Sequence, residues 1–234
     1  MIDFHSHILP GIDDGAQTVE ESMEMLLSLK EQGVNTVVAT PHYRCECSIS
    51  RFISNRDKAY NKLMEAIKES DKSFPEIILG AEVSVSGYLL QHKRLERLCI
   101  GESNYILLEM PQGNWHPFLY NIIYKISAQY HLKVVIAHID RYFSTVGKNK
   151  KILELVKMQP VFQINSPILD YYKGKKLIKW LDMFEVKYIF GTDCHNMDAR
   201  PPLYSAPLKR FTKKHGEDFL NKTNDFVKNT ILKI

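Results

Sequence analysis

The stretch KVVIAH (residues 133–138) indicates the fold, because it is a continuous apolar run of strand length that ends in a histidine. A run without polar alternation is typical of a parallel strand that is covered on both faces. Seven runs of this kind recur along the 234 residues: MIDFH (1–5), VNTVVAT (34–40), IILGAE (77–82), YILLEM (105–110), KVVIAH (133–138), VFQIN (161–165) and KYIFGTD (187–193).

Helical patterns lie between most of these runs. The clearest is TVEESMEMLLSLKEQG (18–33), in which Thr18 and Glu21 predict a capping box and Gly33 predicts the end of the helix. Apolar residues spaced by three and four predict further helices over 51–70, 116–131, 149–158, 175–184, 203–216 and 217–233. Repeated strand and helix, without a linker, predict one α/β domain over residues 1–234: a TIM-like barrel of about seven parallel strands.

Composition and charge exclude several classes of protein. The chain is 44% hydrophobic and 25% charged, as is usual for a globular domain. A net charge of +4 is too small to indicate a nucleic-acid partner. With no long apolar stretch, no secretion signal pattern and only four cysteines, we expect a cytoplasmic protein that does not insert into membranes. The oligomeric state stays open.

Ionisable side chains stand at the ends of the runs, where the active site of a parallel barrel forms. The candidate metal ligands there are His5, His7, His42, Glu82, Glu109, His138, Asp193 and His195. Because uncompensated charges and polar groups are disfavoured in a buried site, bound metal explains their convergence best. Eight such ligands exceed the needs of one ion, so we expect two or three. Mixed imidazole and carboxylate ligands suit manganese, iron or zinc better than calcium or magnesium.

Such a cluster predicts hydrolytic phosphoryl chemistry. A bridging carboxylate, which we assign to Glu109, would let two ions share a hydroxide that attacks phosphorus in line. Arg141 and Arg200 follow the fifth and seventh runs, and a guanidinium group matches phosphate oxygens in a bidentate way. Both arginines are therefore candidates for holding the substrate phosphate.

The cysteines offer a competing mechanism. The pattern Cys-x5-Arg, which is typical of cysteine-dependent phosphatases, occurs as CECSISR (45–51) and as CHNMDAR (194–200). Neither segment contains a glycine, although a loop that wraps phosphate with its backbone amides generally needs small residues. The sequence therefore favours the metal mechanism and assigns no role to Cys45 or Cys47.

Several motifs together resemble a known family. MIDFHSHILPGIDDG, ATPHY, GAEV, YILLEMP, VIAHIDRY and TDCHNMDARPP are similar to motifs of the PHP (polymerase and histidinol phosphatase) superfamily. Within it, they most resemble the bacterial capsule-linked, metal-dependent protein-tyrosine phosphatases. The motifs span residues 1 to about 202, which is nearly the whole chain.

The resemblance implies a distorted (β/α)7 barrel that holds up to three ions, most often manganese, with iron, zinc or magnesium as alternatives. It implies that His5, His7, Glu109 and Asp193 hold one side of the cluster, which Glu82, His42, His138 and His195 complete. Arg141 and Arg200 would bind the phosphate, with Asp14 in support. The implied substrate is the phosphotyrosine tail of a bacterial tyrosine kinase that regulates polysaccharide export.

Two alternatives remain open. The same chemistry would also serve a small phosphate ester such as histidinol phosphate, which a closed pocket would favour over an open rim. In the second alternative the barrel is a non-catalytic scaffold that binds metal. Ligands at nearly every strand end, together with two arginines suited to phosphate, argue against that role.

Overall fold

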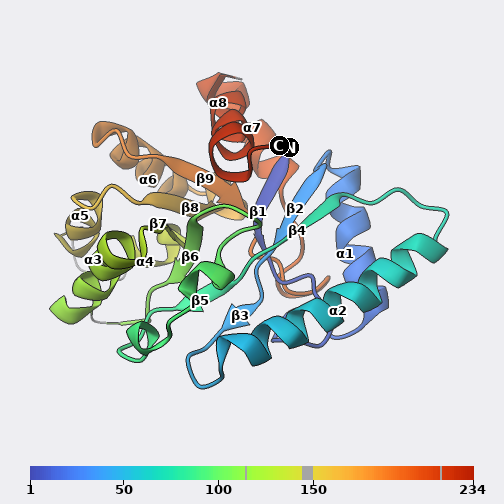
Figure 1. The fold of residues 1–234 in the computed structure, drawn as a ribbon. Coiled ribbons are helices and arrows are strands. Elements are labelled where there is room, and N and C mark those ends of the chain that lie inside the picture. The colour runs from blue at the N-terminus through green and yellow to red at the C-terminus, as the bar shows by residue number, and fades with distance from the viewer. Residues whose placement is uncertain (114, 144–149, 217) are drawn as a thin grey trace.

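The computed structural model describes all residues except 114, 144–149 and 217 (Figure 1). Within this part of the chain, strands form in all seven predicted runs, and every strand pairing is parallel. The strands are β1 (Ile2–Ser6), β2 (Thr36–Ala39), β3 (His42–Tyr43), β4 (Glu76–Leu79), β5 (Glu82–Ser84), β6 (Tyr105–Glu109), β7 (Lys133–Ile136), β8 (Val161–Asn165) and β9 (Tyr188–Gly191).

The strands form two sheets, ordered β1-β2-β4 and β3-β5-β6-β7-β8-β9, that join at both sides. On one side the chain passes directly from β2 to β3 and from β4 to β5, and Pro41, which has no amide hydrogen, lies between β2 and β3. On the other side the amide of Asp193 donates to the carbonyl of His5 (2.7 Å), and Ser6 pairs with Cys194. Hydrogen bonds therefore encircle the molecule as a distorted barrel, as the sequence predicts.

The predicted helices are present. They are α1 (Val19–Glu31), α2 (Ile49–Glu69), α3 (Pro117–Tyr130), α5 (Lys150–Val156), α6 (Tyr172–Met183), α7 (Ser205–His215) and α8 (Asp218–Phe226). Thr18 caps α1 as predicted, by accepting from the amide of Glu21 (3.2 Å). The predicted capping box differs in one contact, because the Glu21 carboxylate accepts from the amide of Gln17 and not from that of Thr18.

Other elements differ from the prediction. No pattern predicts the short helix α4 (Ile139–Tyr142) or the 3-10 turn η3 (Ser166–Asp170). Between β5 and β6, where a barrel repeat would hold a helix, the chain forms only the 3-10 turns η1 (Leu89–Gln91) and η2 (Leu95–Leu98). The predicted helix 217–233 has a first residue that lies outside the described residues, and it ends in a π-helical turn, η4 (Val227–Leu232). No described helix is both long and apolar enough to cross a bilayer.

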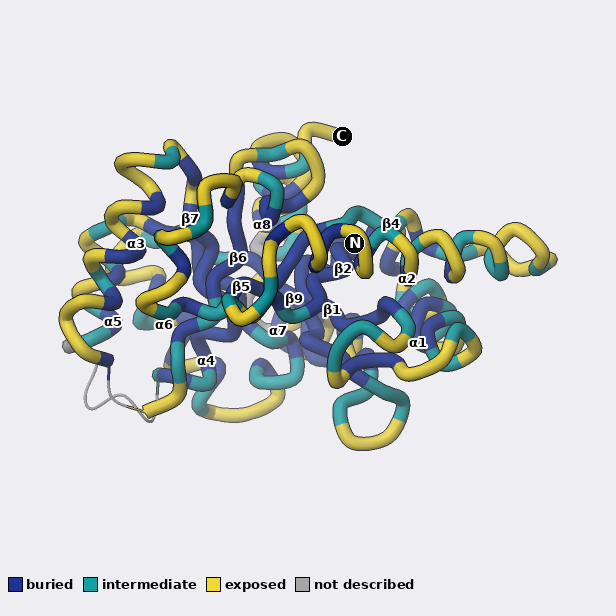
Figure 2. The backbone as a smooth tube through the Cα atoms, turned by 60° about the horizontal axis from the view of Figure 1, so that its bottom comes forward, coloured by how far each residue is buried: buried dark blue, intermediate teal, exposed yellow. Residues whose placement is uncertain are grey.

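Two apolar layers hold the barrel together. The larger lies between strands and helices, and the strands at the centre are buried while the outer helix faces are exposed (Figure 2). The smaller contains every second strand residue, such as Leu107, Val135 and Ile189, and Val227 and Ile231 of η4 pack against it. Successive strand residues point to opposite faces, so the alternation that places Leu107 inside also places Glu109 inside, at the carboxyl end of β6. The barrel interior is thus apolar along its length and ionisable at that end.

Candidate metal centre

All eight predicted ligands lie together at the carboxyl ends of the strands. Six of them are at most 3% exposed: His5, His7, Glu82, His138, Asp193 and His195. Only His42, at the start of β3, and Glu109, at the end of β6, are partly exposed. The strand ends therefore meet in one buried polar cluster, as the sequence predicts.

Seven of the eight predicted ligands, together with Asp14, form three overlapping groups, within each of which the ligand atoms lie within 4.8 Å of one another; His138 belongs to none of the three. The groups are His7, Asp14, His42 and His195; then His5, His7, Glu82 and Asp193; then His42, Glu82 and Glu109. His7 and His42 each belong to two groups, and so does Glu82. These shared residues join the three groups into one cluster.

Glu82 lies at the centre of this cluster. Its Oε2 atom is 3.2 Å from the Nε2 atoms of His5 and His7 and 3.1 Å from Nδ1 of His42. Its Oε1 atom is 2.8 Å from Nε2 of His138. The sequence interpretation groups Glu109 with His5, His7 and Asp193. In the structure, the glutamate that lies beside those three residues is Glu82, the first residue of β5.

Buried atoms without partners show that these residues fit divalent ions. Among the described residues, no hydrogen-bond partner is found for the buried atoms Oε2 of Glu82, Nδ1 of His42 and Nε2 of His195. The Nε2 atoms of His5 and His7 lie only 3.2 Å apart. Buried polar groups normally find a partner. A cation held by these lone pairs would satisfy them together.

The electrostatics of the histidines differ from one another. Burial lowers the pKa of His42, and burial together with the positive charge of His7 lowers that of His195 to about 4. These two rings are neutral near pH 7, as metal-binding imidazoles must be. Burial opposes the charging of His138, yet hydrogen bonds to Glu109 and Glu82 raise its pKa to about 9. The positive charge of a protonated His138 would offset one of the two negative charges on these carboxylates.

The structure also places the three predicted catalytic residues at the mouth of the cluster. The side chains of Arg141 and Arg200 are 36% and 35% exposed, and both guanidinium groups bond to Asp193. Asp14 is 60% exposed, and its carboxylate oxygens lie 3.3 Å from His42 and 3.6 Å from His195. Its placement suits a metal ligand, whereas the sequence interpretation gives it a supporting catalytic role.

Asp13, which the sequence interpretation missed, orients two histidines. Its Oδ2 atom accepts from Nδ1 of His7 (2.7 Å) and from the amide of His42 (2.9 Å). Gly15 makes this approach possible, since a Cβ atom there would lie 2.2 Å from the carbonyl oxygen of His7. The two adjacent aspartates in the sequence IDDG were the only sign of this role in the sequence. Asp13 holds the ring of His7, whereas Asp14 faces His42 and His195.

Gln163 was missed as well. Its Oε1 atom accepts from Nδ1 of His5 (2.9 Å) and from the amide of His138 (2.6 Å). Its Nε2 atom donates to Asn165, whose own amide group donates to Asp193 (3.0 Å each). Gln163 thus connects three of the candidate ligands. A glutamine within an apolar strand carries little signal in the sequence alone.

Neither Cys-x5-Arg segment has the geometry of a phosphate-binding loop. Cys194 is 1% exposed, and burial followed by the charge of Asp3 raises the pKa of its thiol. Arg200, the arginine of the same segment, bonds to Asp193. In the other segment, burial raises the pKa of the Cys45 thiol. The amide of Arg51 donates to the hydroxyl of Ser48, which caps α2. Neither thiol is favoured as a thiolate nucleophile.

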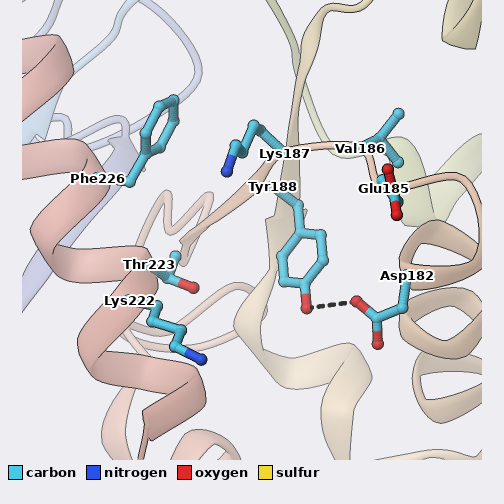
Figure 3. A pocket seen from close by; sticks show the side chains of 8 residues that line it. All are labelled: Asp182, Glu185, Val186, Lys187, Tyr188, Lys222, Thr223 and Phe226. Carbon is cyan, nitrogen blue, oxygen red and sulfur yellow. Dashed lines mark hydrogen bonds between the residues drawn. The ribbon is translucent and has the colours of Figure 1, made fainter.

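Two hollows lie at opposite ends of the barrel. One, of about 390 Å³, adjoins the cluster and is lined by Glu109, Gln112, Gly113, His138, Arg141 and Tyr142. The other, of about 340 Å³, lies at the amino end of β9, where Tyr188 donates to Asp182 while Lys187 and Phe226 flank the opening (Figure 3). Only the first hollow contains candidate ligands.

Residues 1–232 match the family described as Capsular polysaccharide synthesis, CpsB/CapC. The chain belongs to this family. It is similar to the tyrosine-protein phosphatase CpsB of Streptococcus agalactiae serotype III (strain NEM316), with 28% identity over 95% of this chain and 94% of that protein. It is also similar to the tyrosine-protein phosphatase YwqE of Bacillus subtilis (strain 168), with 29% identity over 86% of this chain and 79% of that protein. The family resemblance of the motifs is thereby confirmed.

Solved structures of CpsB/CapC members and of a more distant enzyme share the fold. One chain comes from crystal structures of YwqE from Bacillus subtilis and CpsB from Streptococcus pneumoniae, described as unique metal-dependent tyrosine phosphatases. It matches with a TM-score of 0.81 and 23% identity over 100% of this chain and 95% of that one. A PTE-like lactonase mutant from Deinococcus radiodurans matches with a TM-score of 0.55 and 13% identity over 95% and 92% of the two chains.

Proposed function

We propose that this chain is a metal-dependent phosphatase that hydrolyses phosphotyrosine in proteins. One observation carries the proposal: three overlapping groups of mostly buried ligand residues lie beside two arginines that are about one-third exposed. The CpsB and YwqE relatives are named tyrosine-protein phosphatases and support the same activity. We take residues 1–234 to act as one catalytic domain.

The proposed metal ligands are His5, His7, His42, Glu82, Glu109, His138, Asp193 and His195, with Asp14 as a ninth. When bound, divalent ions would supply an activated water and positive charge for an in-line displacement at phosphorus. We propose manganese, with iron, zinc or magnesium as alternatives, because the ligands mix imidazole and carboxylate. Glu82 and Glu109 each lie close to more than one histidine, so both carboxylates would help to hold the ions.

Arg141 and Arg200 would bind the substrate phosphate. Both guanidinium groups now bond to Asp193, so a phosphate that enters the site would exchange those contacts for its own oxygens. Charge-assisted hydrogen bonds from a planar guanidinium group suit the three equatorial oxygens of the transferring phosphoryl group. Asp13 and Gln163 hold the rings of His7 and His5 in a fixed orientation throughout.

For the substrate we propose the phosphotyrosine tail of a bacterial tyrosine kinase in capsule or exopolysaccharide synthesis, and the cytoplasm as the compartment. Arg141, Arg200 and Asp14 are exposed at the mouth, so a protruding tyrosyl side chain has access to the cluster. The hollow beside the cluster is open on the side of Gln112 and Gly113, which favours a side chain carried on a protein over a small ester such as histidinol phosphate.

Hydrolysis of a phosphotyrosine peptide, before and after chelation, tests the proposal. We expect activity to disappear with the chelator, to return with manganese and to persist after thiol alkylation. Histidinol phosphate and a phosphoserine peptide serve as comparison substrates. Preference for histidinol phosphate would shift the function to the small-ester alternative. Activity that survives chelation and is lost on alkylation would refute the metal mechanism.

A further inference from the structure

The hollow beside the cluster has no role in the hydrolytic mechanism above. It opens between the loop that follows β6 and helix α4, and its volume is about 390 Å³. Ligand pockets usually measure about 300–1,000 Å³, so this hollow suits one small group. Glu109, His138 and Arg141 line one part of it, and it is therefore continuous with the proposed phosphate site. The residues that line the rest are Gln112, Gly113 and Tyr142.

The wall formed by Tyr142 is aromatic and fixed in place. The Tyr142 hydroxyl donates to the carbonyl of Met110 (2.6 Å). The ring of Trp115 packs edge-on against Tyr142 at a centroid distance of 5.1 Å, and its indole N–H donates to Pro111 (2.9 Å). The ring of His138 lies 5.5 Å from that of Tyr142 on the side of the cluster. The hollow is thus preformed.

The opposite side of the hollow is open. Gly113 has a φ of +89°, a conformation that favours glycine, and a Cβ atom added there would meet nothing within 4 Å. Gln112 is exposed at the same rim. A group that is attached to a longer chain can therefore enter between Gln112 and Tyr142.

We propose that this hollow binds the aromatic ring of an aryl phosphate ester while its phosphate lies on the cluster. The inference rests on the proposed function and adds the element that selects the substrate. Tyr142 lines the hollow and offers an aromatic surface against which the ring of the ester would pack. A seryl phosphate carries only a methylene group at this position and leaves the hollow unfilled.

Calorimetric titration of the manganese-loaded protein tests the inference without turnover. The probes are inorganic phosphate, methylphosphonate and phenylphosphonate, at a pH where both phosphonates are dianions. We expect phenylphosphonate to bind roughly tenfold more tightly than methylphosphonate, because the ring loses apolar contact with water. Equal affinity of the two phosphonates would overturn the inference.

Variants at the rim locate the ring. In Gln112→Trp the larger side chain occupies part of the hollow, so we expect the preference for phenylphosphonate to be lost while inorganic phosphate binds as before. The matched control is Gln129→Trp, at an exposed position near the end of α3 that lies away from the cluster. A preference that survives Gln112→Trp, or phosphate binding that weakens equally, would place the ring elsewhere and refute the proposal.

Hydrolysis of the phosphotyrosine peptide is measured on the same samples. A preference for phenylphosphonate without hydrolysis would support the aryl site and refute the proposed function. Hydrolysis without that preference would do the reverse. The two proposals therefore fail separately.

Discussion

The two ends of the barrel treat charge in opposite ways. At the carboxyl ends of the strands, Glu82, His138 and Asp193 are at most 3% exposed, and some of their neighbours have no hydrogen-bond partner. At the amino ends, Asp182 and Lys187 are exposed around an opening (Figure 3), and the apolar residues Val227 and Ile231 of η4 pack against the barrel interior. Burying a charge is costly unless a partner compensates it. The difference identifies the first end as built for a ligand and the second as built for stability.

The strongest test of this comparison replaces one aspartate at each end. Asp193→Ala removes contacts to three histidines and to both arginines, so we expect the rate of phosphotyrosine-peptide hydrolysis to fall by about 1,000-fold or more. Asp182→Ala removes a hydrogen bond to Tyr188 far from the cluster, and we expect it to leave the rate unchanged. Circular dichroism verifies that both variants fold. Equal activity of Asp193→Ala and Asp182→Ala would show that the two ends of the barrel do not differ in function.

A substitution in η4 is expected to act on stability alone. Ile231 is fully buried and packs against the barrel interior. Replacing it with alanine leaves a cavity, and we expect the free energy of unfolding in urea to fall by about 2–4 kcal/mol. The turnover number of the folded protein at 25 °C remains that of the wild type. A comparable loss of turnover would mean that the amino end of the barrel also shapes the active site.

Arg200→Ala tests the phosphate-binding role against a lysine at the other end. Loss of a guanidinium group that stabilises the transferring phosphoryl group should lower kcat/KM by about 100-fold. Lys187→Ala, at the opening shown in Figure 3, should leave kcat/KM unchanged. If inorganic phosphate inhibits the Arg200 variant as strongly as the wild type, the arginine does not bind phosphate.

Gln163→Leu separates positioning of the ligands from ligation itself. Leucine is similar in size but offers no hydrogen bond to His5 or to the amide of His138. Loss of such outer partners typically weakens metal binding 10–100-fold, and we expect manganese affinity measured by calorimetry to fall by about this factor. Gln129→Leu is the exposed control. Unchanged affinity in the Gln163 variant would make its hydrogen bonds structural only.

The sequence predicts the barrel and the cluster well because both depend on periodicity. In a parallel barrel the carboxyl ends of all strands meet, so a residue such as His138 can be placed from its position in its own run. The same reasoning cannot tell which histidines Glu82 and Glu109 each contact, because both glutamates stand near the end of an apolar run of the sequence. Only the distances in the folded structure distinguish them.

Other features could not be predicted because they depend on contacts between distant segments. Gln163 is 25 residues away from His138 and 158 residues away from His5, and nothing in VFQIN marks it as their common partner. The aromatic wall of the hollow joins Trp115 to Tyr142 in the same way. Strands and helices could be predicted from patterns among neighbouring residues. The hydrogen bonds that orient the ligands could be identified only in the folded structure.

The smallest effect is expected for the cysteines. Burial raises the pKa of the Cys194 thiol, so it remains protonated as the pH rises through the ordinary thiol range near 9. We therefore expect Cys194→Ser and Cys45→Ser to retain most of the activity, and alkylation of the wild type at pH 8 to change it little. The comparison with Asp193→Ala is direct, because residues 193 and 194 are adjacent and only one faces the cluster. A large loss of activity in Cys194→Ser, with normal manganese content, would mean that the thiol is the nucleophile and that the metal cluster has a structural role.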